Sequence, residues 1–201
     1  MRKIETLEAL HALYGTPGSA SLRKVVAKLT PQYRRWIMSS RFCMLATVGP
    51  EGVDVSPRGD EGPVVTELDQ HHVMMPDWRG NNRLDSLRNI VRDPRVSLIF
   101  MVPGSNTAIR LIGQGIVSDD PDLRARFDRS GKQPISVIVV RIDEIYSQCA
   151  RALIRSGLWT VGDQSAGLPT PGDLLAEGSG GEEGGKLYDD AWPARAARTM
   201  W

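Results

Sequence analysis

Two short segments contain the residues best suited to chemistry, and the first is Ser56-Pro57-Arg58-Gly59. It follows Val53-Asp54-Val55, whose alternation is typical of a β-strand, and the proline breaks that alternation. A strand that ends in this way brings backbone amides, a hydroxyl and a guanidinium together at a bend, where glycine permits the close approach of a flat ligand. The plain alternative is a surface turn without a ligand.

The second segment, residues 75–83, leads from an apolar strand into a helix expected over residues 81–92. Asparagine donors, arginines and the free amides of a helix N-terminus together form an anion site, for which phosphate is the expected ligand. Residues 77–95 include five arginines and three aspartates, which gives a local charge of +2. The alternative is an ordinary capped helix whose arginines face solvent.

Several common classes of enzyme lack their signatures in this sequence. His11, His71 and His72 are the only histidines, and none has the i, i+4 partner of a helical zinc site. A serine hydrolase of the Gly-x-Ser-x-Gly type is disfavoured because the sequence lacks that elbow. Gly113-Gln114-Gly115 lacks the third glycine of a dinucleotide-binding fingerprint, and Gly131-Lys132 lacks the rest of a phosphate-binding loop. We therefore expect neither hydrolytic chemistry nor a metal site.

Composition narrows the choice of partners. The chain has 201 residues and a formal net charge of +1, so it carries no global field that would attract nucleic acid or an anionic membrane. Cys43 and Cys149 are too few for a disulfide framework or a four-cysteine zinc site. No segment approaches the roughly 20 apolar residues of a membrane span. We expect a cytoplasmic protein that binds neither nucleic acid nor a membrane.

Apolar segments separated by turn residues predict a mainly β domain, with six strands that form a closed or partly closed antiparallel barrel. The predicted strands cover residues 42–48, 53–56, 72–75, 96–102, 108–117 and 136–142. Helices are expected over residues 4–14, 31–39, 81–92, 119–127, 146–158 and 189–200. We therefore divide the chain into an N-terminal helical extension (1–40), a barrel domain (41–160) and a C-terminal extension (161–201). The last contains a flexible glycine-rich segment, 178–185, and Trp201, which we expect to dock on the barrel or on a second subunit.

In this order, these pieces resemble the pyridoxamine 5′-phosphate oxidase-like superfamily of FMN-binding split barrels. The resemblance rests on Ser56-Pro57-Arg58-Gly59, on Met75-Pro76-Asp77 with Asn82-Arg83, and on the strands at 93–100 and 110–116. Some pieces also resemble a bacterial branch of FMN-dependent enzymes whose substrate is unassigned. The resemblance implies a six-stranded antiparallel split β-barrel with flanking helices, a homodimer, and FMN at the subunit interface.

The resemblance also implies which residues contact FMN: Ser56, Pro57, Arg58, Gly59, Met75, Pro76, Arg79, Asn82, Arg83 and Thr107. Among them, Arg58 is expected to stabilise the negative charge that reduction places on the flavin. The chain departs from the family where Asn-Asn-Arg replaces Ser-Arg-Lys, and where Thr107 replaces a glutamine that contacts the flavin. Which of Arg79, Asn82 and Arg83 holds the phosphate is therefore open.

We thus expect an FMN-dependent oxidoreductase that transfers hydride through flavin N5, to or from a nicotinamide or a small organic substrate. Pyridoxamine phosphate is not favoured as that substrate, because the family's contacts to it do not match cleanly. Two alternatives remain open. One is a non-catalytic protein that binds flavin or haem, and the other is a reductase that uses the deazaflavin F420. The anionic tail of F420 could contact Arg34, Arg35 and Arg41.

Overall fold

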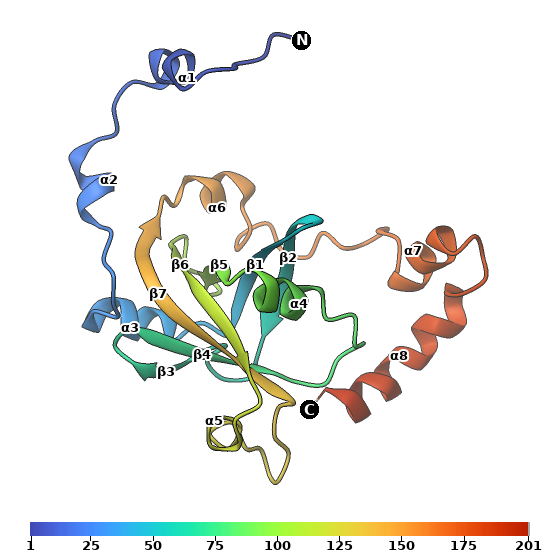
Figure 1. Cartoon of the computed structure of the whole chain (residues 1–201). Coiled ribbons are helices and arrows are strands. Elements are labelled where there is room, and N and C mark those ends of the chain that lie inside the picture. Colours follow the sequence, from blue (N-terminus) through green and yellow to red (C-terminus); the bar gives the residue numbers. More distant parts are fainter. Residues whose placement is uncertain (201) are drawn as a thin grey trace.

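A computed structural model describes residues 1–200, in which helices flank one antiparallel β-sheet (Figure 1). The strands are β1 (Phe42–Gly49), β2 (Gly52–Gly59), β3 (Thr66–Asp69), β4 (His72–Asp77), β5 (Arg95–Met101), β6 (Ala108–Ser118) and β7 (Ser136–Gln148). The helices are α1 (Leu7–Tyr14), α2 (Ser19–Arg23), α3 (Pro31–Ile37), α4 (Asp85–Arg92), α5 (Pro121–Ala125), α6 (Arg151–Ser156), α7 (Pro171–Gly178) and α8 (Gly185–Thr199).

The prediction of six strands in a barrel is wrong in two respects. Within residues 1–200 the sheet has seven strands, in the order β2-β1-β5-β6-β7-β4-β3, and no backbone ladder joins its two edges. The missed strand is β3, which pairs only with β4 and has a register shift between Glu67 and Asp69. Its four residues include two acids and no apolar run, so no strand signal precedes it.

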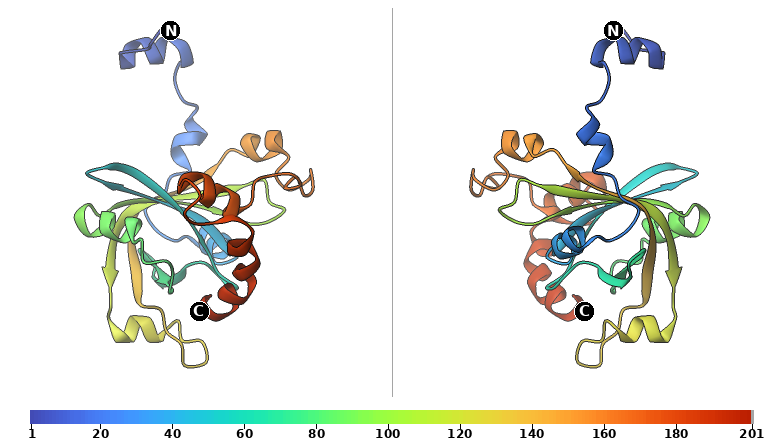
Figure 2. Two further views of the ribbon diagram at one scale, coloured as in Figure 1. Left: turned by 90° about the vertical axis from the view of Figure 1, so that its right-hand side faces the viewer. Right: turned by 90° about the vertical axis from the view of Figure 1, so that its left-hand side faces the viewer.

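The sheet curls although it does not close, and Figure 2 shows its curvature. β2 lies at one edge and β4 is the sixth strand in the order, yet Arg58 of β2 contacts Asp77 of β4 at 2.6 Å between Nη1 and Oδ1. A side-chain ion pair, rather than backbone hydrogen bonds, therefore spans the opening between these two strands.

The core lies inside the curled sheet, and β7 shows how the strands build it. Successive side chains of a strand point to opposite faces. Ile138 and Val140 join the main core, whereas Val137 and Val139 pack with Met74 on the other face, beneath the segment that carries α5. The first half of β7 is buried on both faces, and for this reason its sequence is a nearly continuous run of apolar residues.

Several of the expected helices form, some with different limits. The expected start at Thr30-Pro31 is confirmed, since the Thr30 side chain accepts a hydrogen bond from the Tyr33 amide and Pro31 opens α3. The helix expected over 146–158 is wrong in its first part, because β7 continues to pair with β6 as far as Gln148. Only α6 then remains helical in this segment.

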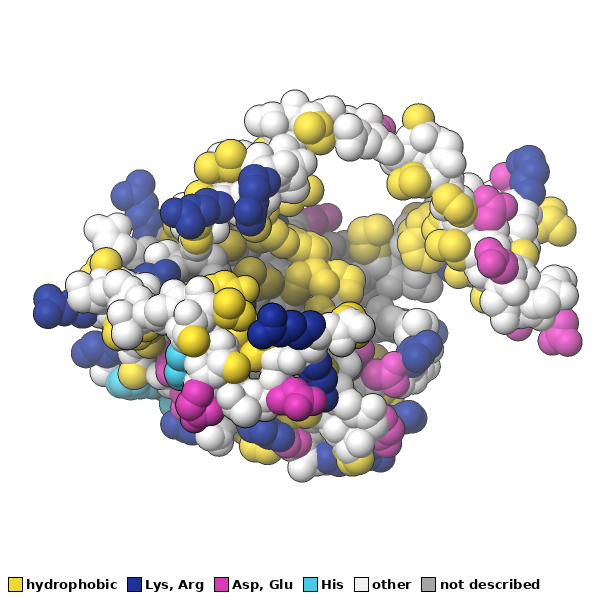
Figure 3. Space-filling view, turned by 90° about the horizontal axis from the view of Figure 1, so that it is seen from above, with side chains coloured by type: hydrophobic (Ala, Val, Ile, Leu, Met, Phe, Trp, Pro, Cys, Tyr) yellow, Lys and Arg dark blue, Asp and Glu magenta, His cyan; other side chains and the backbone are white. Residues whose placement is uncertain are grey.

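The C-terminal extension forms a pair of helices. Thr170 and Asp173 make a capping box at the start of α7, which the sequence did not reveal, and residues 179–184 form the turn into α8. Asp189 of α8 accepts hydrogen bonds from the Gly172 amide at 2.8 Å and the Thr170 hydroxyl at 2.6 Å. A linker places this pair of helices at a distance from the strands. In the space-filling view, a hollow separates the helix pair from the strands (Figure 3). The expected docking of Trp201 lies outside the described residues.

Candidate functional site

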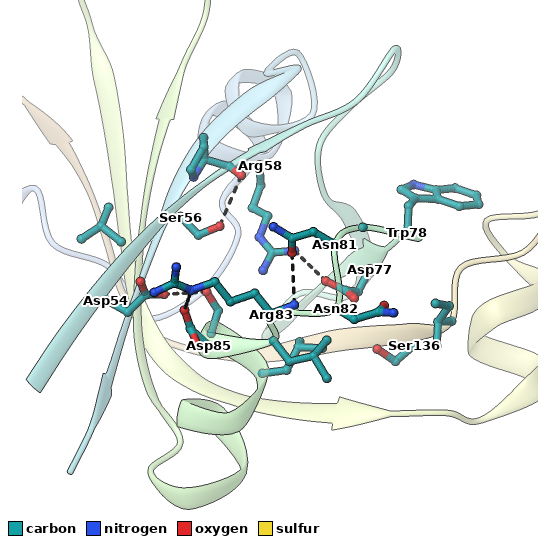
Figure 4. Close-up of a pocket in the computed structure, with 17 residues that line it drawn as sticks. Asp54, Ser56, Arg58, Asp77, Trp78, Asn81, Asn82, Arg83, Asp85 and Ser136 are labelled. Atoms are coloured by element: carbon teal, nitrogen blue, oxygen red, sulfur yellow. Dashed lines mark hydrogen bonds and ion pairs between the residues drawn. The ribbon is translucent and has the colours of Figure 1, made fainter. Parts of the chain in front are cut away.

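A cleft of about 580 Å³ lies between β2, the end of β4 and the loop before α4 (Figure 4). Strand alternation explains how β2 contributes to it. Asp54, Ser56 and Arg58 share one face and are half-buried, whereas Val53 and Val55 are exposed. The cleft brings together five of the predicted residues: Ser56, Pro57, Arg58, Asn82 and Arg83.

Arg58 is the most constrained cation of this cleft, since 21% of its side chain is exposed. Its Nη1 donates to Asp77 Oδ1 at 2.6 Å. Its Nε is buried and has no hydrogen-bond partner among residues 1–200. A buried donor without a partner carries a desolvation cost, which a hydrogen bond to a ligand oxygen or nitrogen would offset.

The helix expected from residue 81 begins later, at Asp85. Asn82 and Leu84 have φ angles of 59° and 62°, so the chain before α4 turns through the left-handed region instead of continuing as a helix. The Asn81 side chain accepts a hydrogen bond from the Arg83 amide at 3.1 Å, which holds this turn together. The predicted helix N-terminus carrying two asparagines is therefore wrong, and the asparagines belong to a loop.

Arg83 reaches the cleft from this loop, and 80% of its side chain is exposed. Its Nε donates to Asp85 Oδ2 at 2.5 Å, and this hydrogen bond is the main cause of the raised pKa of Arg83. No hydrogen bond or ion pair within the described chain uses its two terminal nitrogens, although the charge of Asp54 also contributes to raising its pKa. Arg83 can therefore still present a two-pronged donor to an anion.

The charge of the cleft differs from the sequence estimate. Its lining has two guanidinium groups, Arg58 and Arg83, and three carboxylates, Asp54, Asp77 and Asp85. The formal sum is 2 − 3 = −1, compared with +2 counted along residues 77–95. Most arginines of that segment do not line this cleft, while β2 supplies Asp54, which accepts a hydrogen bond from the Ser86 hydroxyl at 2.8 Å.

The other predicted residues lie outside the lining of this cleft. Met75 belongs to the main core, and Pro76 is buried in β4. Gly59 is exposed at the end of β2, and Arg79 is exposed in the loop. Thr107 lies in the turn between β5 and β6, where its amide donates to the Ser105 hydroxyl.

Trp78 lines the cleft and was not singled out in the sequence. The Arg129 guanidinium lies 5.2 Å from the centre of its ring and also forms an ion pair with Asp60, whose side chain is only 4% exposed. Through these contacts, the loop that follows α5 stabilises the position of Trp78 at one side of the cleft. Because Arg129 is distant in sequence, no local pattern could have indicated them.

A metal site, a membrane span and a binding site for a deazaflavin tail each place their own requirements on residues 1–200. No group of three His, Cys, Asp or Glu side chains in this range is arranged to hold a metal ion. Likewise, no helix in the same range is both long enough and apolar enough to cross a bilayer. Of the arginines expected to contact a deazaflavin tail, Arg34 is held by Glu67 at 2.5 Å, and neither Arg35 nor Arg41 lines the cleft.

A sequence profile of the family described as pyridoxamine 5′-phosphate oxidase matches residues 29–149, which is more than half of the chain. The chain belongs to this family. The match spans all seven strands of this pyridoxamine 5′-phosphate oxidase family member and leaves α1, α2 and α6–α8 outside it. All ten predicted cofactor contacts fall within the matched range. No curated protein matches the chain.

Solved structures of similar proteins cover only part of the chain. HupZ of Group A Streptococcus is 14% identical, with a TM-score of 0.49, over 59% of this chain and 93% of its own. An F420 reductase is 20% identical, with a TM-score of 0.43, over 58% of this chain and 98% of its own. General stress protein 26 of Bacillus anthracis is 16% identical, with a TM-score of 0.43, over 56% of this chain and 88% of its own.

Proposed function

We propose that the cleft binds FMN and that the protein is an FMN-dependent oxidoreductase. One observation carries the proposal: in a member of this family, Arg58 lines the cleft and its buried Nε–H has no hydrogen-bond partner among residues 1–200. The volume of about 580 Å³ falls within the range of small-molecule and cofactor sites. The Ser56 hydroxyl and the Asn81 and Asn82 amides add uncharged donors and acceptors.

The residues of the cleft fit the two ends of FMN in different ways. Arg58 would bind the flavin ring, where its fixed positive charge stabilises negative charge that develops there. Arg83 and Asn82 would bind the phosphate, because the terminal nitrogens of Arg83 are open. The chemistry that bound FMN supplies is two-electron hydride transfer between a reduced nicotinamide or small organic substrate and an acceptor such as oxygen.

The decisive experiment is a titration of cofactor-free protein with FMN, followed by visible absorbance. We expect wild-type protein to take up FMN. Arg58→Lys should bind it about tenfold more weakly, since lysine keeps a charge beside Asp77 but lacks the Nε–H. The control is Arg151→Lys, which changes an exposed arginine of α6 outside the cleft. Absence of FMN uptake by wild-type protein, or equal affinity in Arg58→Lys, would contradict the proposal.

Anaerobic addition of NADPH to the loaded protein separates an enzyme from a carrier. Bleaching of the flavin within seconds supports an oxidoreductase, whereas a stable yellow colour supports a protein that only stores its ligand.

A further inference from the structure

A second cleft, of about 390 Å³, adjoins the first. It lies between the turn that joins β1 to β2 and the residues Arg88, Asn89 and Arg92 of α4. The two clefts share Asp54, Arg83 and Asp85, so a ligand can extend from one into the other. Of the proposed FMN contacts, Arg83 alone lines this second cleft.

The second cleft contains three arginines, and their charges are compensated unequally. Arg83 is paired with Asp85. Arg92 lies 3.2 Å from Glu51. The Arg88 side chain makes no hydrogen bond or ion pair with any other residue of the described chain.

Arg88 and Arg92 lie four residues apart on α4, so they are neighbours on the same helical face. Like charges at this spacing destabilise a helix. An anion bound between them would relieve this repulsion, and guanidinium groups bind phosphate in a two-pronged geometry. Two such groups one turn apart suit two adjacent phosphoryl groups better than a single carboxylate.

We infer that Arg88 and Arg92 form a subsite for the diphosphate of an elongated substrate, whose other end reaches the flavin through the shared part of the clefts. This inference rests on the proposed FMN site, and it specifies the substrate as a diphosphate-containing organic molecule such as a dinucleotide reductant. Glu51 shares Arg92 with the ligand, and Arg88 supplies a guanidinium group that no carboxylate of the described chain contacts directly.

The test is calorimetric titration with inorganic pyrophosphate and with ADP, using both FMN-loaded and cofactor-free protein. We expect wild-type protein and the control Arg151→Gln to bind both probes. Arg88→Gln should bind them about tenfold more weakly, the loss expected for one charge-assisted interaction. FMN affinity should be unchanged in Arg88→Gln, since Arg88 does not line the first cleft.

Each outcome separates this inference from the proposal of FMN binding. Pyrophosphate binding that is absent, or equal in wild-type protein and Arg88→Gln, overturns the subsite whatever the FMN result. Loss of FMN affinity in Arg88→Gln also overturns it, because this arginine would then belong to the cofactor site. If the cofactor-free protein binds pyrophosphate but never takes up FMN, the anion site stands and the proposal of FMN binding is refuted.

Discussion

The two cysteines lie in opposite surroundings, and their reactivity should differ accordingly. Cys43 is fully buried in β1, and this burial raises the pKa of its thiol to about 12. Cys149 is exposed. Because the thiolate is the nucleophile, Cys43 should be inert at pH 8. A disulfide reagent should label one thiol per native chain and two in denaturant. The variant Cys149→Ser should label only after denaturation, and rapid labelling of its native form would contradict this assignment.

Side chains of the candidate site were predictable where a local pattern determines their direction. Ser56 and Arg58 are two residues apart on one strand, so alternation alone places them on the same face. Asp54 shares that face and was missed, because its role depends on α4, which brings Ser86 to it. Met75 is a different case. The family resemblance implies that it contacts FMN, whereas in the structure the curled sheet encloses its side chain in the main core.

At the scale of elements, the boundary of α4 shows a limit of periodicity. The apolar spacing of residues 84–91 correctly indicates a helix, but it does not indicate where that helix begins. Leu84 immediately precedes α4 with a φ of 62°, a conformation that costs a non-glycine residue roughly 1–2 kcal/mol. Its carbonyl oxygen accepts the hydrogen bond from the Arg88 amide at 2.9 Å, so Leu84 caps α4 without belonging to its helical run.

The pairing of β6 with β7 depends on a glycine at the register shift between Ile112 and Gly113. A Cβ at Gly113 would lie 2.0 Å from the Arg141 carbonyl oxygen, which belongs to the backbone of the paired strand and cannot move aside. We expect Gly113→Ala to destabilise the protein by about 1–3 kcal/mol, measured as the free energy of unfolding in urea.

The matched control is Gly115→Ala in the same strand. There the nearest atom to the added methyl is Val96 Cγ1 at 3.2 Å, a side-chain atom that can shift. The loss should therefore be smaller than in Gly113→Ala. An equal or reversed order of the two unfolding free energies would show that the close approach at Gly113 is not what the sheet requires.

At the scale of the whole molecule, the two edges of the sheet are unlike each other. β3 is four residues long and carries Glu67 and Asp69, features that discourage pairing with another chain. β2 has eight residues and exposes Val53 and Val55, with relative accessibilities of 76% and 53%. An edge strand of this length with two exposed valines is suited to contact with another molecule. The sequence suggested a closed or partly closed barrel, and it did not reveal which edges of the sheet are left open.

We therefore predict that the protein is a homodimer that uses β2 and the adjoining cleft as its interface, with FMN between the subunits. Sedimentation of the FMN-loaded protein should give twice the mass of the chain. Val53→Lys should shift it toward the monomer, because a charge would be desolvated at the interface. Val91→Lys is the matched control, since Val91 is also 76% exposed but lies on α4 outside both clefts. A monomeric wild-type protein would show that there is no such dimer. Equal dissociation of both variants would show that the interface does not use β2.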